Sequence, residues 1–152
     1  MRILFQFNLV TMRTPFDDPF LDDFRAWIPA LHALAQVHPG FVWRYEGEKG
    51  DDGYIKPYPD APLIMGNMSA WKDYHSLYDY TFSSSHLEMM KHKRKWFKKM
   101  SIPYAVLYYG VAGDLTKPPL ELLEEAKRCL SYLSVYGETP VAFNFGSHNG
   151  VL

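Results

Sequence analysis

Residues 2–11, RILFQFNLVT, alternate in the manner of a β-strand, and this opening strand constrains the fold more than any other segment. One face carries Ile3, Phe5, Phe7 and Leu9, and the other carries Leu4, Gln6, Asn8 and Val10. The second face therefore places two amides, Gln6 and Asn8, at the centre of a strand. Because buried amides need hydrogen-bond partners, we expect a neighbouring strand or a ligand beside them.

The segments that follow predict the order of the remaining elements. Patterning predicts helices over 20–37, 72–80, 85–99 and 118–136, strands over 41–46, 63–71 and 104–111, a polar turn over 47–53, and a last short strand or extended tail over 141–145. The first six elements of this β-α-β-β-α-β-α-β order match the ferredoxin-like plan of the α+β class, an antiparallel sheet with helices on one face. We find no linker, so residues 1–152 are expected to form a single domain.

Aromatic residues make up 16% of the chain, which is more ring surface than one small core usually needs. If helices cover only one face of the sheet, the other face must be buried by something else. Pairing two such sheets would bury it, so the pattern predicts a homodimer. The rings are then expected to divide between the dimer interface and the wall of a pocket.

Charge and hydropathy exclude several functional classes. The net charge is −1, so there is no basic field for nucleic acid, and no apolar run approaches the roughly 20 residues of a membrane span. The apolar start carries one cation, Arg2, and no cleavage site follows, so we expect no signal peptide and a cytoplasmic location. A lone cysteine, Cys129, offers neither an internal disulfide nor a metal-ligand set.

The richest segment for chemistry is residues 69–97, where His86, Met90, Lys93 and Phe97 have the spacing of one helix face. His86 lies near the predicted helix N-terminus, where the dipole favours a neutral imidazole. Such a ring can act as a general acid or base, ligate a haem iron, or make a structural hydrogen bond. His75, on the preceding short helix, is the second candidate catalytic histidine.

Polar side chains also occur in the middle of predicted strands, namely Gln6, Asn8, Arg44, Asn67 and Tyr108. They are explained either by pairing at a strand edge or interface, or by a ring-lined cavity with a few polar anchors, the usual form of a small-molecule site. On the second interpretation the expected substrate-binding residues are Gln6, Asn8, Trp43, Arg44, Trp71, Tyr80, Met90 and Tyr108. No metal-ligand motif is present, so we predict no metal site unless His86 binds haem.

Four stretches resemble a bacterial family, domain of unknown function 3291. They are PGFVWRY at 39–45, MSAWKDYHSLYDYTFSSSHLEMMKHKRKWF at 68–97, AVLYYGVAG at 105–113 and EEAKRCLSYLSVYGETPVAFNF at 124–145, and Asn8 lies where the first strand of that family has an asparagine. The resemblance covers nearly the whole chain. It implies a dimeric α/β barrel, in which ferredoxin-like protomers associate through their sheets.

The wider superfamily includes cofactor-free monooxygenases, haem-degrading enzymes, aldoxime dehydratases, chlorite dismutases and small-molecule cyclases. The W…Y…H…R-x-W-F pattern of residues 71–97 is also similar to spheroidene monooxygenase-like proteins, which use haem. That weaker resemblance implies His86 as an axial iron ligand.

Three functional hypotheses follow. The first is an enzyme that oxygenates, cyclises or isomerises an apolar or aromatic biosynthetic intermediate between the sheet and the second helix, without a cofactor and with His86 as acid or base. The second is a haem-dependent monooxygenase or dehydratase with His86 as the axial ligand. The third is a non-catalytic dimer that binds a ligand.

Overall fold

The computed structural model describes residues 1–46, 55–101 and 104–145, so the turn expected over 47–53 lies outside the described residues. The chain forms a five-stranded antiparallel sheet with the order β2-β3-β1-β4, in which β5 also pairs with β1. The strands are β1 (Arg2–Met12), β2 (Phe41–Arg44), β3 (Ile64–Trp71), β4 (Phe97–Lys98) and β5 (Ala105–Val111). The helices are η1 (Pro19–Leu21), α1 (Asp22–Gln36), α2 (Tyr74–Thr81), α3 (Ser84–Met90), α4 (Lys93–Trp96), η2 (Ala112–Thr116) and α5 (Pro119–Tyr136). The antiparallel sheet and the α+β class that the sequence predicts are confirmed.

The opening strand is the centre of the sheet, and its alternation decides what lies on each side. β1 pairs with β3 from Leu4 to Thr11 and with β5 from Arg2 to Asn8. Phe5 and Phe7 point to one face, where they join a core with Leu122, Ala126 and Leu130 of α5. The opposite face of β1, which carries Gln6 and Asn8, points toward α1, α2 and α3.

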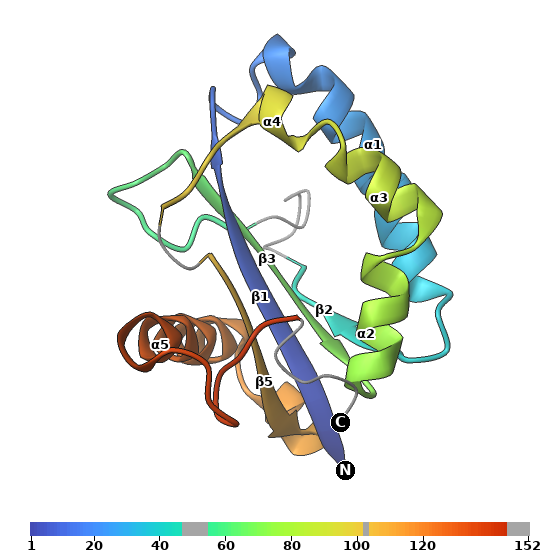
Figure 1. Ribbon diagram of the computed structural model, residues 1–152, viewed down its shortest axis with the longest axis vertical. Helices are drawn as coiled ribbons and strands as arrows, with labels where there is room; N and C mark the ends of the chain where they lie inside the picture. The colour runs from blue at the N-terminus through green and yellow to red at the C-terminus, as the bar shows by residue number, and fades with distance from the viewer. Residues whose placement is uncertain (47–54, 102–103, 146–152) are drawn as a thin grey trace.

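Helices cover both faces of the sheet, which differs from the expectation of helices on one face. α1 to α4 lie on one side, and α5 lies on the other (Figure 1). The reason is the apolar stripe of α5, whose buried residues are Leu122, Leu123, Ala126, Leu130 and Leu133. Part of the ring-rich face is therefore buried within the chain, and the homodimer stays a prediction.

The segment expected to form one helix over 85–99 is instead divided into α3, α4 and β4. Trp96 and Phe97 are both buried, and each packs against Phe24 of α1. Phe97 also pairs with Met12 of β1, so the chain becomes extended at this point. Lys93 and Phe97 therefore do not continue the helix face of His86 and Met90.

Gly40 fixes how closely α2 approaches the end of the α1–β2 connection. A Cβ built on Gly40 overlaps both Oγ and Cβ of Ser76, and the Gly40 carbonyl accepts a hydrogen bond from the Lys72 amide at 2.7 Å. We expect Gly40→Ala to lower the free energy of unfolding by about 1–3 kcal/mol through overpacking. Urea unfolding measures this, with Gly113→Ala as control because nothing lies within 4 Å of a Cβ at Gly113. Equal stability of the two variants would contradict the predicted close approach.

Candidate functional site

A cavity of about 500 Å³ lies between the sheet and helices α1, α2 and α3. The sequence predicts a substrate pocket between the sheet and the second helix, whereas this cavity also borders α1 and α2, and its use as a substrate site stays a prediction. Apolar and aromatic side chains from both layers form most of its wall, including Phe24, Ile28, Leu31, Phe41, Met65, Trp71, Leu77, Met89 and Phe145. Polar groups also line it, namely Gln6, Asn8, His32, Arg44, Asn67, Ser69, Tyr80, Thr81, His86, Tyr104 and Asn144.

Seven of the ten predicted site residues line this cavity: Gln6, Asn8, Arg44, Trp71, Tyr80, His86 and Met90. The other three lie elsewhere. Tyr108 is buried in the core under α5, where its ring stacks on Phe5 at 5.2 Å, and Trp43 contacts the same Phe5 ring edge-on. His75 is exposed on α2 and is not among the residues that line the cavity. One histidine of the predicted pair therefore reaches the cavity.

His86 of α3 is one of the titratable residues that line the cavity. Its ring lies 5.3 Å from the ring of Tyr80, and Nδ1 is buried with no hydrogen-bond partner in the described part of the chain. Burial is the larger influence and lowers the pKa of His86, while a hydrogen bond to the backbone of Thr81 acts in the opposite direction. The imidazole is therefore held neutral at neutral pH and is able to accept a proton.

A one-way chain of hydrogen bonds crosses the cavity face of the sheet. The indole Nε1 of Trp71 donates to Ser69 Oγ at 2.9 Å, and Ser69 Oγ donates to Gln6 Oε1 at 2.9 Å. Gln6 Nε2 then donates to Asn8 Oδ1. An indole nitrogen can only donate, so the first bond runs from Trp71 to Ser69, and with the two amides as they stand the chain continues to Asn8.

Arg44 and His32 form a second polar pair on the cavity wall. Arg44 Nη1 donates to His32 Nδ1 at 2.7 Å, and Nη2 lies 3.3 Å from a carboxylate oxygen of the exposed Glu46. The sequence reasoning missed His32. Its signal was helical spacing on α1, because Ile28, His32 and Ala35 all face the cavity.

Acid is expected to destabilise the fold through His32. Burial and the Arg44 guanidinium lower its pKa from 6.5 to about 4, while Glu46 acts in the opposite direction. The unfolded chain therefore binds more protons, so the contribution of His32 to stability is present above about pH 6.5 and is lost as the pH falls towards 4.

Urea unfolding at neutral and at acidic pH measures this loss. We expect His32→Gln to make the decrease in unfolding free energy shallower than in the wild type, because glutamine takes up no proton. His75→Gln, which removes an exposed histidine outside the cavity, is the matched control. A decrease in His32→Gln as steep as in the wild type would count against the predicted burial of a neutral imidazole.

Tyr80 and Trp71 form a rigid aromatic wall. Trp71 is fully buried, stacks on Tyr80 at 5.0 Å between ring centroids and meets Phe41 edge-on at 5.5 Å. The Tyr80 hydroxyl donates to the Leu31 carbonyl at 3.1 Å, and burial raises its pKa to about 12. Tyr80 therefore stays protonated at neutral pH and is committed to the backbone of α1, which makes it a wall residue.

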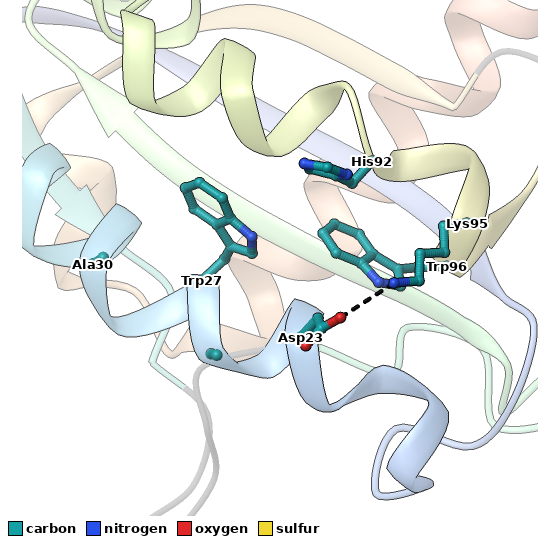
Figure 2. A pocket seen from close by; sticks show the side chains of 7 residues that line it. Asp23, Trp27, Ala30, His92, Lys95 and Trp96 are labelled. Atoms are coloured by element: carbon teal, nitrogen blue, oxygen red, sulfur yellow. Dashed lines mark hydrogen bonds and ion pairs between the residues drawn. The ribbon is translucent and has the colours of Figure 1, made fainter.

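A second hollow, of about 310 Å³, lies on the outer side of the molecule between α1 and α4. Figure 2 shows the rings of Trp27, His92 and Trp96 around it, with Lys95 and Asp23 joined by an ion pair of 3.2 Å. Lys95 and Asp23 are both mostly exposed to solvent. We call this hollow the α1/α4 groove, and it is distinct from the cavity between sheet and helices.

Within the described ranges, no group of three or more His, Cys, Asp or Glu side chains is arranged to hold a metal ion. No helix in those ranges has the length and apolar character needed to cross a bilayer.

Solved structures share this fold at low sequence identity. A protein from Methanosarcina mazei Go1 has a TM-score of 0.52 and 14% identity, and the match covers 72% of this chain and 92% of that chain. A protein from Nitrosomonas europaea, provisionally described as an antibiotic biosynthesis monooxygenase, has a TM-score of 0.52 and 13% identity, with 72% and 91% covered. At such identities the likeness shows the ferredoxin-like fold alone.

Comparison with curated proteins found no significant match. The family described as domain of unknown function (DUF3291) matches residues 3–150, nearly the full length of the chain. The resemblance seen in the sequence is therefore confirmed, and the chain belongs to the DUF3291 family.

Proposed function

We propose that the protein is a small-molecule enzyme that removes a proton from an apolar or aromatic substrate held between the sheet and α1 to α3, with His86 as the acid–base group. The observation that carries the proposal is a buried histidine nitrogen without a partner in the described chain, beside a cavity of about 500 Å³. Its neutral imidazole suits a general base near neutral pH.

The reaction begins when His86 takes a proton from a C–H or O–H group that is made acidic by a neighbouring carbonyl or ring. The electron pair stays on the substrate and gives an enolate-like anion. That anion is the common precursor of addition to dioxygen, of ring closure and of return of the proton to another carbon. The apolar wall, with Trp71 and Phe41, excludes the water that would otherwise reprotonate it.

Deuterium exchange into 2-tetralone, a two-ring ketone with an activated CH₂ group, tests the proposal without knowledge of the natural substrate. We expect the full-length protein to accelerate exchange in D₂O above the buffer rate, as followed by proton NMR. Quenching of tryptophan fluorescence shows whether the ketone binds. Binding without accelerated exchange would favour the non-catalytic ligand-binding alternative and overturn the proposed enzyme.

Among the reactions that can follow proton removal, oxygenation is assayed first, because the Nitrosomonas europaea neighbour is provisionally described as a monooxygenase.

Haem remains an alternative role for His86, with the imidazole as its axial ligand. A haem carries two propionate groups, whereas Arg44 is the only residue with a permanent positive charge among the described residues that line the cavity. The donor set therefore fits haem poorly, and we derive no step through it. A Soret band after reconstitution with haemin, lost in His86→Ala, would favour this alternative.

Two further features of the proposed enzyme come from the sequence. We propose that residues 1–152 act as one domain and that two copies associate as a homodimer. Analytical ultracentrifugation at several protein concentrations measures whether two copies associate.

A further inference from the structure

Two polar groups of the cavity wall, Asn8 and Arg44, offer hydrogen-bond donors, in contrast to the acceptor nitrogen of His86. At the end of the chain from Trp71, Asn8 Oδ1 is occupied by Gln6 Nε2. The amide nitrogen of Asn8 is therefore left with N–H groups that find no partner among the described residues, at a position on the cavity wall.

The Arg44–His32 pair also presents hydrogen-bond donors. A guanidinium can only donate, so His32 Nδ1 must be the acceptor in the 2.7 Å bond, and the ring hydrogen lies on Nε2. Arg44 Nε is buried and has no hydrogen-bond partner within the described chain. Glu46, whose carboxylate lies 3.3 Å from Arg44 Nη2, is exposed and is not among the described residues that line the cavity.

The charge of the cavity wall also favours a ligand that accepts hydrogen bonds. Neither an aspartate nor a glutamate is among the described residues that line the cavity, so the Arg44 guanidinium is its only permanent charge. A partly buried cation that is incompletely hydrogen-bonded is stabilised by an anion that takes its free N–H groups. A ligand that brings neutral hydrogen-bond donors to Arg44 and Asn8 would instead set donors against donors.

We propose that the ligand is an anion with an apolar body, in which an ionised oxygen, as in a carboxylate or an enolate, is held by Arg44 and the Asn8 amide while the rings contact Phe41 and Tyr80. This inference rests on the proposed function and narrows its substrate class. It also gives Asn8 and Arg44 a role in the proposed reaction, because the negative charge left on the substrate by His86 develops beside donors.

Calorimetric titration of the full-length protein with 2-naphthoate and with 2-naphthamide tests the proposal. The two probes share one ring system and differ in charge. We expect 2-naphthoate to bind at least about tenfold more tightly than 2-naphthamide, since a charge-assisted hydrogen bond replaces a neutral one. Arg44→Gln is expected to abolish this preference, and Asn8→Asp to lower naphthoate affinity while still accepting the Gln6 hydrogen bond.

Two further variants, Arg44→Lys and Lys95→Gln, serve as controls for the titration. Arg44→Lys keeps the positive charge but loses the paired N–H donors of the guanidinium. It is expected to retain part of the preference for 2-naphthoate over 2-naphthamide, and it serves as the test variant if Arg44→Gln does not fold. Lys95→Gln removes the cation of the α1/α4 groove (Figure 2) and is expected to change neither affinity. If Lys95→Gln, and not Arg44→Gln, removes the preference, the proposed site is overturned.

Equal affinity for the two probes would overturn the anion subsite and leave the proposed enzyme standing. Failure of the wild type to bind either probe would also overturn the subsite. The exchange of 2-tetralone protons decides separately on the proposed function, because that probe is neutral when it binds.

Discussion

His86→Ala is expected to lower the rate of 2-tetralone exchange by about 100-fold or more, close to the buffer rate, because a positioned general base typically contributes 10²–10⁴. The protein is expected to keep its fold, since His86 is only partly buried and Nδ1 makes no hydrogen bond to the described residues. Proton NMR in D₂O measures the rate, and thermal unfolding measures the stability. An alanine variant that exchanges at the wild-type rate would remove His86 from the mechanism.

The pH profile of the same reaction separates a base from a structural side chain. Burial lowers the pKa of His86 below 6.5, so the neutral, proton-accepting form is still abundant at pH 6.5 and declines only at more acidic pH. The wild-type rate is therefore expected to stay level from about pH 8 to 6.5 and to fall below that range. His75→Ala is the matched control, and it is expected to leave both rate and profile unchanged because His75 does not line the cavity.

Trp71→Ala is expected to cost about 3–5 kcal/mol of unfolding free energy, the range for removal of a buried indole. Trp71 has no exposed surface, and its ring contacts Phe41, Tyr80 and His38. The alanine leaves a cavity where β3 packs against the α1 and α2 side of the sheet. Urea unfolding, monitored by far-ultraviolet circular dichroism so that the signal does not depend on the lost indole, gives the value.

Trp27→Ala is the matched control for this loss. Trp27 lies at the α1/α4 groove and is only partly buried, so its replacement is expected to destabilise the fold less (Figure 2). Equal destabilisation by the two substitutions would contradict the assignment of Trp71 to the core beneath the cavity. Trp71→Phe keeps the ring but loses the indole N–H, so the difference between Phe and Ala at this position separates packing from the hydrogen bond to Ser69.

Local patterns in the sequence predicted most of the elements. The period-2 alternation of residues 2–11 predicted the central strand and the two opposite faces of Phe5 and Asn8, because each face of a central strand meets a different layer. Arg44 and Trp71 reached the cavity for the same reason. Tyr108 did not, since its place in β5 turns the ring to the α5 side.

The remaining features depend on contacts between distant parts of the chain. The end of α3 after Met90 is set by the packing of Trp96 and Phe97 on Phe24 of α1, far away in the sequence. The helical spacing of His32 indicates its side of α1, but its pairing with Arg44 of β2 depends on the packing of α1 against the sheet. The sequence also did not predict that α5 packs on the second face of the sheet, because an apolar stripe on a helix does not determine which surface the helix will cover.

The indole of Trp71 has a consequence for how selective the cavity is toward other molecules. A side-chain amide can usually turn over by 180°, exchanging its oxygen and nitrogen at little steric cost, and so adapt to a donor or an acceptor. Turning Gln6 over would set its nitrogen beside Ser69 Oγ and remove the oxygen that accepts the hydrogen of the Ser69 hydroxyl. It would also set two oxygens against each other at Asn8. The hydrogen bonds thus favour the present orientation of both amides, and in the proposed anion site this orientation selects ligands by their polarity before any bond is broken.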